Sequence, residues 1–168
     1  FSTGVEAMDR ILGGGFAPGA SILVGGEPGI GKSTLLLQLA GAVASLGKNV
    51  LYLSGEEALS QIKARAERLG VLHENLAGIA TSQIEDIYPL LENGQAPDLL
   101  IVDSVQTVST SQDEGLPGNV SQVRDVATEL AEVCRKAGTC VLFVGHVTKE
   151  GAIAGPKLLE HLVDTVIS

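Results

Sequence analysis

The chain has 168 residues, of which 45% are hydrophobic and 18% charged, and its formal net charge at pH 7 is −9. This length and apolar content predict one globular domain over residues 1–168 with a buried core. The acidic balance excludes the broad basic surface on which nucleic-acid affinity usually depends, although a ring of subunits can still gather a few lysines around one channel.

Two further classes are disfavoured by the composition. No apolar run is long enough to cross a membrane, and the first residues lack the basic and hydrophobic regions of a signal peptide. We therefore expect a cytoplasmic protein with no membrane partner. Cys134 and Cys140 have neither CxxC nor Cys/His spacing, so we expect reduced core residues rather than a zinc site or a disulfide.

Along the chain, a short helix over Val5–Leu12 comes first, and strand and helix patterns then alternate. The predicted strands are Ser21–Gly25, Asn49–Ser54, Leu76–Ala80, Asp98–Asp103, Thr139–Gly145 and Leu162–Ile167. The predicted helices are Leu35–Leu46, Ala58–Leu69, Ile84–Leu91 and Val120–Lys136. This alternation predicts an α/β fold with a mainly parallel sheet and helices on both faces.

A phosphate-binding loop follows the first predicted strand and precedes a helix, which is the context that such a motif needs. Its glycines let backbone N–H groups and the positive end of the helix point at one anion. Lys32 would reach the β and γ phosphates of a nucleoside triphosphate, and the Ser33 hydroxyl would bind Mg²⁺. The loop consists of Gly26, Glu27, Pro28, Gly29, Ile30, Gly31, Lys32 and Ser33, and Thr34 follows it.

Two acidic residues, Glu56 and Glu57, follow the second predicted strand and should lie at the same sheet edge as the phosphate loop. Hydrolysis of a phosphoanhydride needs mainly positioning and charge stabilisation, so one carboxylate suffices to hold the attacking water. We expect at least one of them to be the base, with Glu56 the first candidate. The alternative is that both stabilise the positive end of the helix beginning at Ala58.

The fourth predicted strand ends in Asp103. A carboxylate at this place can orient Mg²⁺ beside the phosphates. Taken alone, such an Asp is as often a helix cap, but together with the upstream phosphate loop it predicts a metal ligand.

His146 follows the fifth predicted strand, which should lie between the strands carrying Lys32 and Asp103. It can sense the γ-phosphate, or it can be an ordinary polar residue at a strand end. Two long loops, 104–119 and 146–157, follow the fourth and fifth strands, and ligands of open α/β sheets usually bind at such loops.

Four stretches resemble the RecA-like ATPases and, within them, the bacterial RadA (Sms) family of DNA repair proteins. The most specific is Gly145–Gly151 followed by Ala154–Pro156. The others are Leu12–Gly15 with Pro18–Gly19, the phosphate loop with Thr34–Gln38, and Ser54–Glu57.

This resemblance implies a RecA-like P-loop ATPase with strand order 3-2-4-5-1-6 that forms a homo-hexameric ring around single-stranded DNA. It further implies that the ATPase drives branch migration of recombination intermediates with the RecA recombinase as partner. Loops 104–119 and 146–157 match the DNA-facing loops of the family, and Lys149, followed by Lys157 and Arg124, is the best candidate for DNA contact.

Compared with that family, the sequence lacks the four-cysteine zinc module, the Lys-Asn-Arg-Phe-Gly motif and the Lon-protease-like domain. We therefore expect the ATPase core of a longer protein. Two alternatives share part of the pattern: a KaiC-like signalling ATPase or kinase, and a non-catalytic scaffold that uses bound nucleotide only to fix its fold or its oligomeric state.

Overall fold

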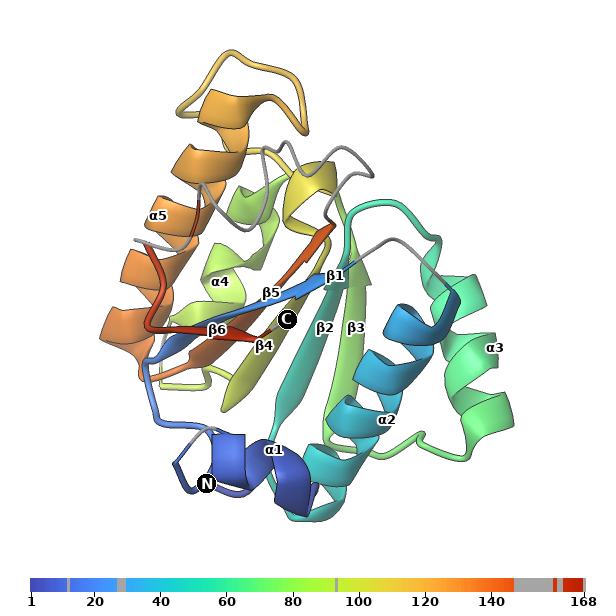
Figure 1. Ribbon diagram of the computed structural model, residues 1–168. Helices are drawn as coiled ribbons and strands as arrows, with labels where there is room; N and C mark the ends of the chain where they lie inside the picture. Colours follow the sequence, from blue (N-terminus) through green and yellow to red (C-terminus); the bar gives the residue numbers. More distant parts are fainter. Residues whose placement is uncertain (12, 27–29, 93, 147–158, 160–161, 168) are drawn as a thin grey trace.

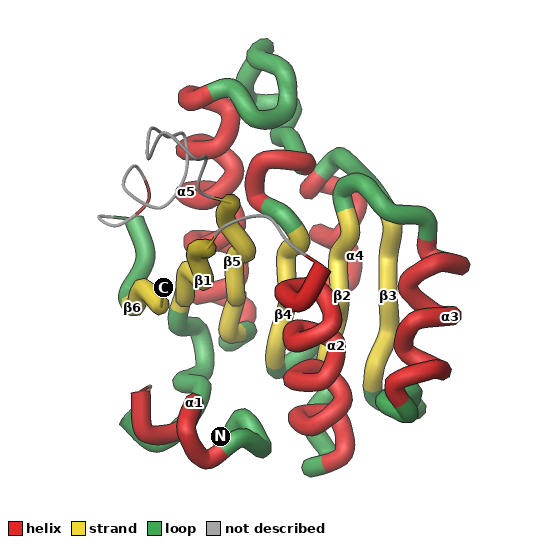
Figure 2. The backbone as a smooth tube through the Cα atoms, turned by 45° about the vertical axis from the view of Figure 1, so that its right-hand side comes forward, coloured by secondary structure: helices red, strands yellow, loops and turns green. Residues whose placement is uncertain are grey.

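The computed structural model describes residues 1–11, 13–26, 30–92, 94–146, 159 and 162–167. Its centre is a six-stranded sheet in the order β3-β2-β4-β5-β1-β6, in which every pairing is parallel. This order confirms the prediction and is easily followed in Figure 2. The strands are β1 (Ser21–Gly26), β2 (Val50–Ser54), β3 (Leu76–Ala80), β4 (Leu99–Asp103), β5 (Cys140–His146) and β6 (Thr165–Ile167).

Helices cover both faces of the sheet, as the alternating pattern predicts (Figure 1). One face packs against α2 and α3, and the other against α4 and α5. The helices are α1 (Glu6–Ile11), α2 (Ile30–Ser45), α3 (Leu59–Leu69), α4 (Tyr88–Leu91) and α5 (Val120–Ala137). No helix among the described residues is long and apolar enough to span a bilayer.

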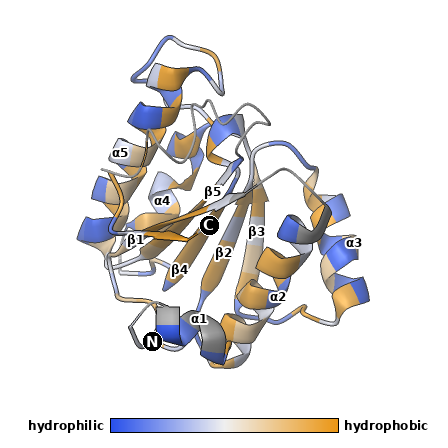
Figure 3. Cartoon of the chain, in the orientation of Figure 1, coloured by the Kyte–Doolittle hydropathy of each residue, from blue (hydrophilic) through white to orange (hydrophobic). Residues whose placement is uncertain are grey.

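The core is divided by the sheet into two layers. Successive side chains of a strand point to opposite faces, so Leu100 and Val102 of β4 join the cluster under α4 and α5, whereas Leu99 and Ile101 join the one under α2 and α3. The central strands are apolar along their length because both faces are dry (Figure 3). Cys134 and Cys140 are buried free thiols in separate layers, and burial raises the pKa of each to about 12.

The predicted start of α2 was wrong by five residues, and the difference matters for the site. The helix begins at Ile30 rather than at Leu35, so Lys32 and Ser33 lie in its first turn. Glycines have no hydrophobic periodicity and low helix propensity, which hides this first turn in the sequence. The amide groups of that turn face the region where the loop is expected to hold phosphate.

Two other predicted elements are shorter or divided. The helix predicted over Ile84–Leu91 is a 3₁₀ turn (Ile84–Ile87) followed by the four-residue α4, because Pro89 has no N–H and fits only the first turn of a helix. The last strand begins at Thr165 rather than at Leu162. Leu162 N–H instead closes a turn on Leu159 O, at 2.8 Å.

Candidate nucleotide-binding site

The carboxyl ends of the central strands bring the predicted site residues to one edge of the sheet. In the strand register, Gly26 of β1 pairs with His146 of β5, and Asp103 of β4 pairs with Val144 of β5 and Ser54 of β2. The end of β1, which leads into the phosphate loop, therefore lies directly beside His146. β5 lies between β1 and β4, as predicted.

Lys32 reaches across this edge from the first turn of α2. Its Nζ donates a hydrogen bond to Gly145 O at 3.1 Å, and its side chain is half-buried. Burial lowers the pKa of Lys32, and the nearby Asp103 carboxylate opposes that effect. A partly desolvated ammonium at a helix N-terminus is well suited to bind phosphate oxygens.

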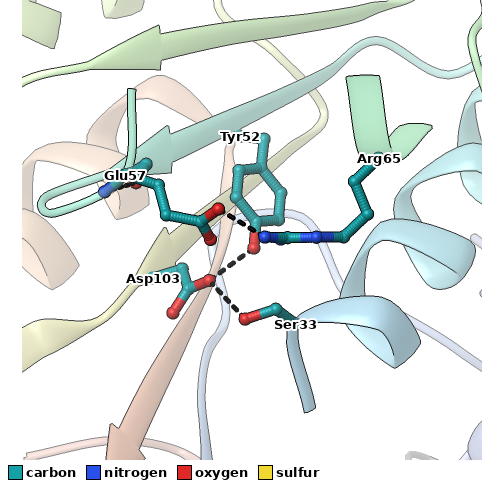
Figure 4. A network of polar contacts seen from close by, with 6 residues as sticks. Ser33, Tyr52, Glu57, Arg65 and Asp103 are labelled. Atoms are coloured by element: carbon teal, nitrogen blue, oxygen red, sulfur yellow. Dashed lines mark hydrogen bonds and ion pairs between the residues drawn. The ribbon is translucent and has the colours of Figure 1, made fainter. Parts of the chain in front are cut away.

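Ser33 and Asp103 meet where the metal ion was predicted. Ser33 Oγ donates to Asp103 Oδ2 at 3.3 Å, and Tyr52 OH donates to the same oxygen at 2.5 Å (Figure 4). A hydroxyl and a carboxylate are hard oxygen ligands, and Mg²⁺ takes few protein ligands because it keeps several waters. The residues present therefore fit Mg²⁺, and no cluster of three or more His, Cys, Asp or Glu side chains, which the described part of the chain lacks, is required.

The structure separates the two glutamates that follow β2. Glu56 is exposed, whereas Glu57 is half-buried and forms an ion pair with Arg65 of α3. The backbone N–H of Glu57 also donates to Ser54 Oγ at 3.0 Å. Glu57 is thus occupied by a partner within the protein, while Glu56 lies near enough to His146 to influence its titration.

His146 ends β5 as a half-buried residue whose backbone is held by Gln106. Gln106 Nε2 donates to His146 O at 3.2 Å, and His146 N–H donates to Gln106 Oε1 at 3.3 Å. Burial lowers the pKa of His146, with a further contribution from the Lys32 charge, while Asp103 and Glu56 oppose the shift. The imidazole is therefore neutral near pH 7, and its Nδ1 is buried with no hydrogen-bond partner among the described residues.

Some predicted site residues are not brought to this edge. Glu27, Pro28, Gly29, Lys149 and Lys157 lie outside the described residues. Thr34 is half-buried in the first turn of α2, after Gly26, which ends β1, and Ile30 and Gly31, which begin the helix. Arg124 is exposed on α5, which covers the opposite face of the sheet from α2 and has Asp113 and Asp125 close by.

Three residues at the site were not predicted from the sequence: Tyr52, Arg65 and Gln106. A signal for Arg65 does exist, because it lies between Ile62 and Ala66, the buried positions of α3, where the helical period calls for an apolar residue. Tyr52 places one hydroxyl in an otherwise apolar strand. Its contact with Asp103 depends on the register of β2 with β4, which no local pattern indicates.

The fold and the site define the class of protein. A family described as "AAA domain" matches residues 4–152, and the chain belongs to this family. Its six-stranded parallel sheet in the order 3-2-4-5-1-6 is consistent with a RecA-like P-loop ATPase.

More particular relatives are proteins named "DNA repair protein RadA", which confirms the resemblance read from the motifs. The chain is 48% identical over 165 residues to that of Halalkalibacterium halodurans and 51% identical over 166 residues to that of Aquifex aeolicus. For the Streptococcus pneumoniae protein the identity is 48% over 165 residues. These alignments cover 98–99% of this chain but only 36–39% of each relative, so the chain spans little more than a third of their length.

Proposed function

We propose that this chain is the ATPase core of a DNA repair motor that binds single-stranded DNA and drives branch migration of recombination intermediates. The observation that carries the ATPase part is the convergence of Lys32, Ser33 and Asp103 at one sheet edge. The repair part is supported by the similarity to RadA proteins over nearly the whole chain. We propose the cytoplasm as the place of action.

The proposed roles follow from the geometry of the site. Lys32 exchanges its bond to Gly145 O for phosphate oxygens, which hold the ammonium more strongly because they are charged. Ser33 and Asp103 hold Mg²⁺, which neutralises charge on the phosphates when bound. Glu56 is proposed to orient the attacking water and take its proton, since its carboxylate has no printed partner in the protein and lies at the open side of the edge.

His146 is proposed as the sensor of the γ-phosphate. A neutral imidazole can donate one hydrogen bond, and its backbone is fixed by Gln106 beside the start of the phosphate loop. Gain or loss of a phosphate contact at His146 would then be felt at the start of the loop 146–157. This is the proposed route from nucleotide to DNA.

DNA contact is proposed for Lys149, with Lys157 and Arg124 behind it, in a homo-hexameric ring that works with the RecA recombinase. A net charge of −9 means that the basic groups would have to be gathered around one channel. Replacing Lys149 with Ala should weaken single-strand binding at low salt and reduce the slope of log K against log salt by about one unit. An unchanged slope would remove the loop 146–157 from the DNA site.

The experiment that tests the function is the rate of ATP hydrolysis by the full-length protein with and without single-stranded DNA. We expect DNA to raise the rate. A rate that is indifferent to DNA would favour a signalling ATPase, and tight Mg²⁺–ATP binding with no turnover in either condition would favour a nucleotide-dependent scaffold.

A further inference from the structure

We propose that Arg65 is a positioning residue of the ATPase: by holding Glu57, it fixes the segment that follows β2 and leaves Glu56 as the carboxylate available to the attacking water. This inference rests on the proposed function, and it assigns to Arg65 and Glu57 a joint task that neither has alone.

The contact itself is specific. Arg65 Nη2 donates to Glu57 Oε2, and the two side chains are 22% and 30% exposed, so the pair is partly shielded from water. Shielded ion pairs are stronger and less screened by salt than exposed ones. By contrast, the pair between Arg10 and Glu6 has side chains that are 77% and 84% exposed.

The position of the pair relates it to the site. Figure 4 shows the Arg65 guanidinium beside the Tyr52 hydroxyl, between Glu57 on one side and the Ser33–Asp103 contact on the other. Hydrogen bonding to Glu57, followed by the charges of Glu57, Tyr52 and Asp103, raises the pKa of Arg65 against the effect of its burial. The guanidinium therefore stays charged beside two carboxylates, Glu57 and Asp103, and limits their mutual repulsion.

The segment that carries Glu56 is short and closely packed. Gly55 N–H donates to Asp103 O at 3.1 Å, and a Cβ on Gly55 would lie 2.4 Å from Thr107 Oγ1 and 2.7 Å from Thr107 O. The segment is thus anchored at Gly55 by this contact and at Glu57 by Arg65. Glu56 lies between the two anchors, and its placement depends on both.

The ion pair also decides between the two glutamates. A carboxylate paired with a guanidinium is a weak base, because the cation favours its ionised form, and a water would have to compete with Arg65 for its oxygens. Glu57 is in that situation, and Glu56 is not. Arg65 and Glu57 should therefore act as one unit in turnover, and removing either should misplace Glu56.

The test is a double-mutant cycle in the full-length protein with Arg65→Met, Glu57→Gln and both together, measuring kcat, KM and equilibrium binding of a fluorescent ATP analogue. We expect each single variant to lose about tenfold in kcat with little change in analogue binding, and the double variant to lose no more than the worse single one. Arg65→Lys should recover part of the loss. Arg68→Met, an exposed change one turn further along α3, is the control and should match the wild type.

A second readout needs no nucleotide. Amide hydrogen exchange over residues 55–58 should be faster in Arg65→Met than in the wild type or Arg68→Met, while exchange in β2 and β4 stays the same. If Arg65→Met exchanges faster throughout the sheet, or if its loss in kcat multiplies with that of Glu57→Gln, the positioning role is wrong. A wild-type protein that does not hydrolyse ATP would overturn the proposed function, whereas a wild-type rate in Arg65→Met would overturn this inference alone.

Discussion

The two ends of the parallel strands differ in how their polar groups are satisfied. At the amino ends, side chains bind backbone: Asp98 Oδ2 accepts from Asn49 N–H at 2.9 Å, and Thr139 Oγ1 donates to Pro97 O at 2.7 Å. At the carboxyl ends, side chains bind one another across β2, β4, α2 and α3.

The difference teaches which end is built for stability and which for chemistry. A side chain bonded to backbone closes a turn and has no further task. Side chains bonded to one another can exchange partners when a ligand arrives, and atoms such as His146 Nδ1 and Arg65 Nη1 are buried there with no hydrogen bond among the described residues. Substitutions at the carboxyl ends should therefore change activity, and those at the amino ends should change the free energy of unfolding.

The largest effect is expected from Glu56→Gln. Loss of the proposed base should lower the rate of phosphate release by about 10²- to 10⁴-fold, with ATP binding and melting temperature nearly unchanged. Glu57→Gln is the matched variant and should lose far less. If Glu57→Gln abolishes hydrolysis and Glu56→Gln does not, the assignment of the base is wrong.

Lys32→Ala should come next. It removes a charged donor to the phosphates, worth about 3 kcal/mol or roughly a hundredfold in Kd for ATP, while the unfolding midpoint in urea should hardly move. Lys63→Ala, at an exposed position of α3, serves as the control and should bind normally. Equal affinity in Lys32→Ala and Lys63→Ala would remove the phosphate loop from the site.

At the opposite end, Asp164→Ala should act on stability alone. Asp164 Oδ2 accepts from Ser21 N–H at 2.9 Å, and Ser21 is buried, so its donor would lose its protein acceptor at a cost of about 1–3 kcal/mol. Asp164→Asn keeps an acceptor oxygen and should lose less. Urea unfolding measures both, and a loss of ATP affinity without a loss of stability would contradict the division between the two ends.

The smallest effect concerns the thiols, which belong to neither end's chemistry. Burial raises the pKa of Cys134 and Cys140 to about 12, so almost no thiolate is present at pH 8 in the folded protein. Mass spectrometry should find no alkylation by iodoacetamide until urea unfolds the chain. Rapid modification under native conditions would show that the core layers open more readily than their packing indicates.

Much of this arrangement could be predicted from the sequence, for a physical reason. Buried parallel strands need continuous apolar runs, and Leu99–Val102 is such a run ending in Asp103. Parallel strands with short loops place their last residues at one edge, so Lys32, Ser33, Asp103 and His146 could be assigned to it before any coordinates. The strand order, in contrast, came from the resemblance.

What could not be predicted depends on contacts between distant elements. The bond from Tyr52 to Asp103 requires the β2–β4 register, and the pair of Glu57 with Arg65 requires the docking of α3 beside the end of β2. Periodicity describes which face of a helix is buried but does not say what a charged residue on that face will meet. The two glutamates after β2 therefore remained equivalent in the sequence and differ only in the fold.

The early start of α2 has a thermodynamic consequence. A helix has no acceptors of its own for the amide groups of its first turn, and in α2 that turn contains Lys32 and Ser33. An anion in the loop supplies those acceptors, so binding a nucleotide and completing the helix are a single event. Free ligand at a hundred times its Kd should raise the free energy of unfolding by about 2.7 kcal/mol, and the resistance of this domain to unfolding would then follow the nucleotide concentration around it.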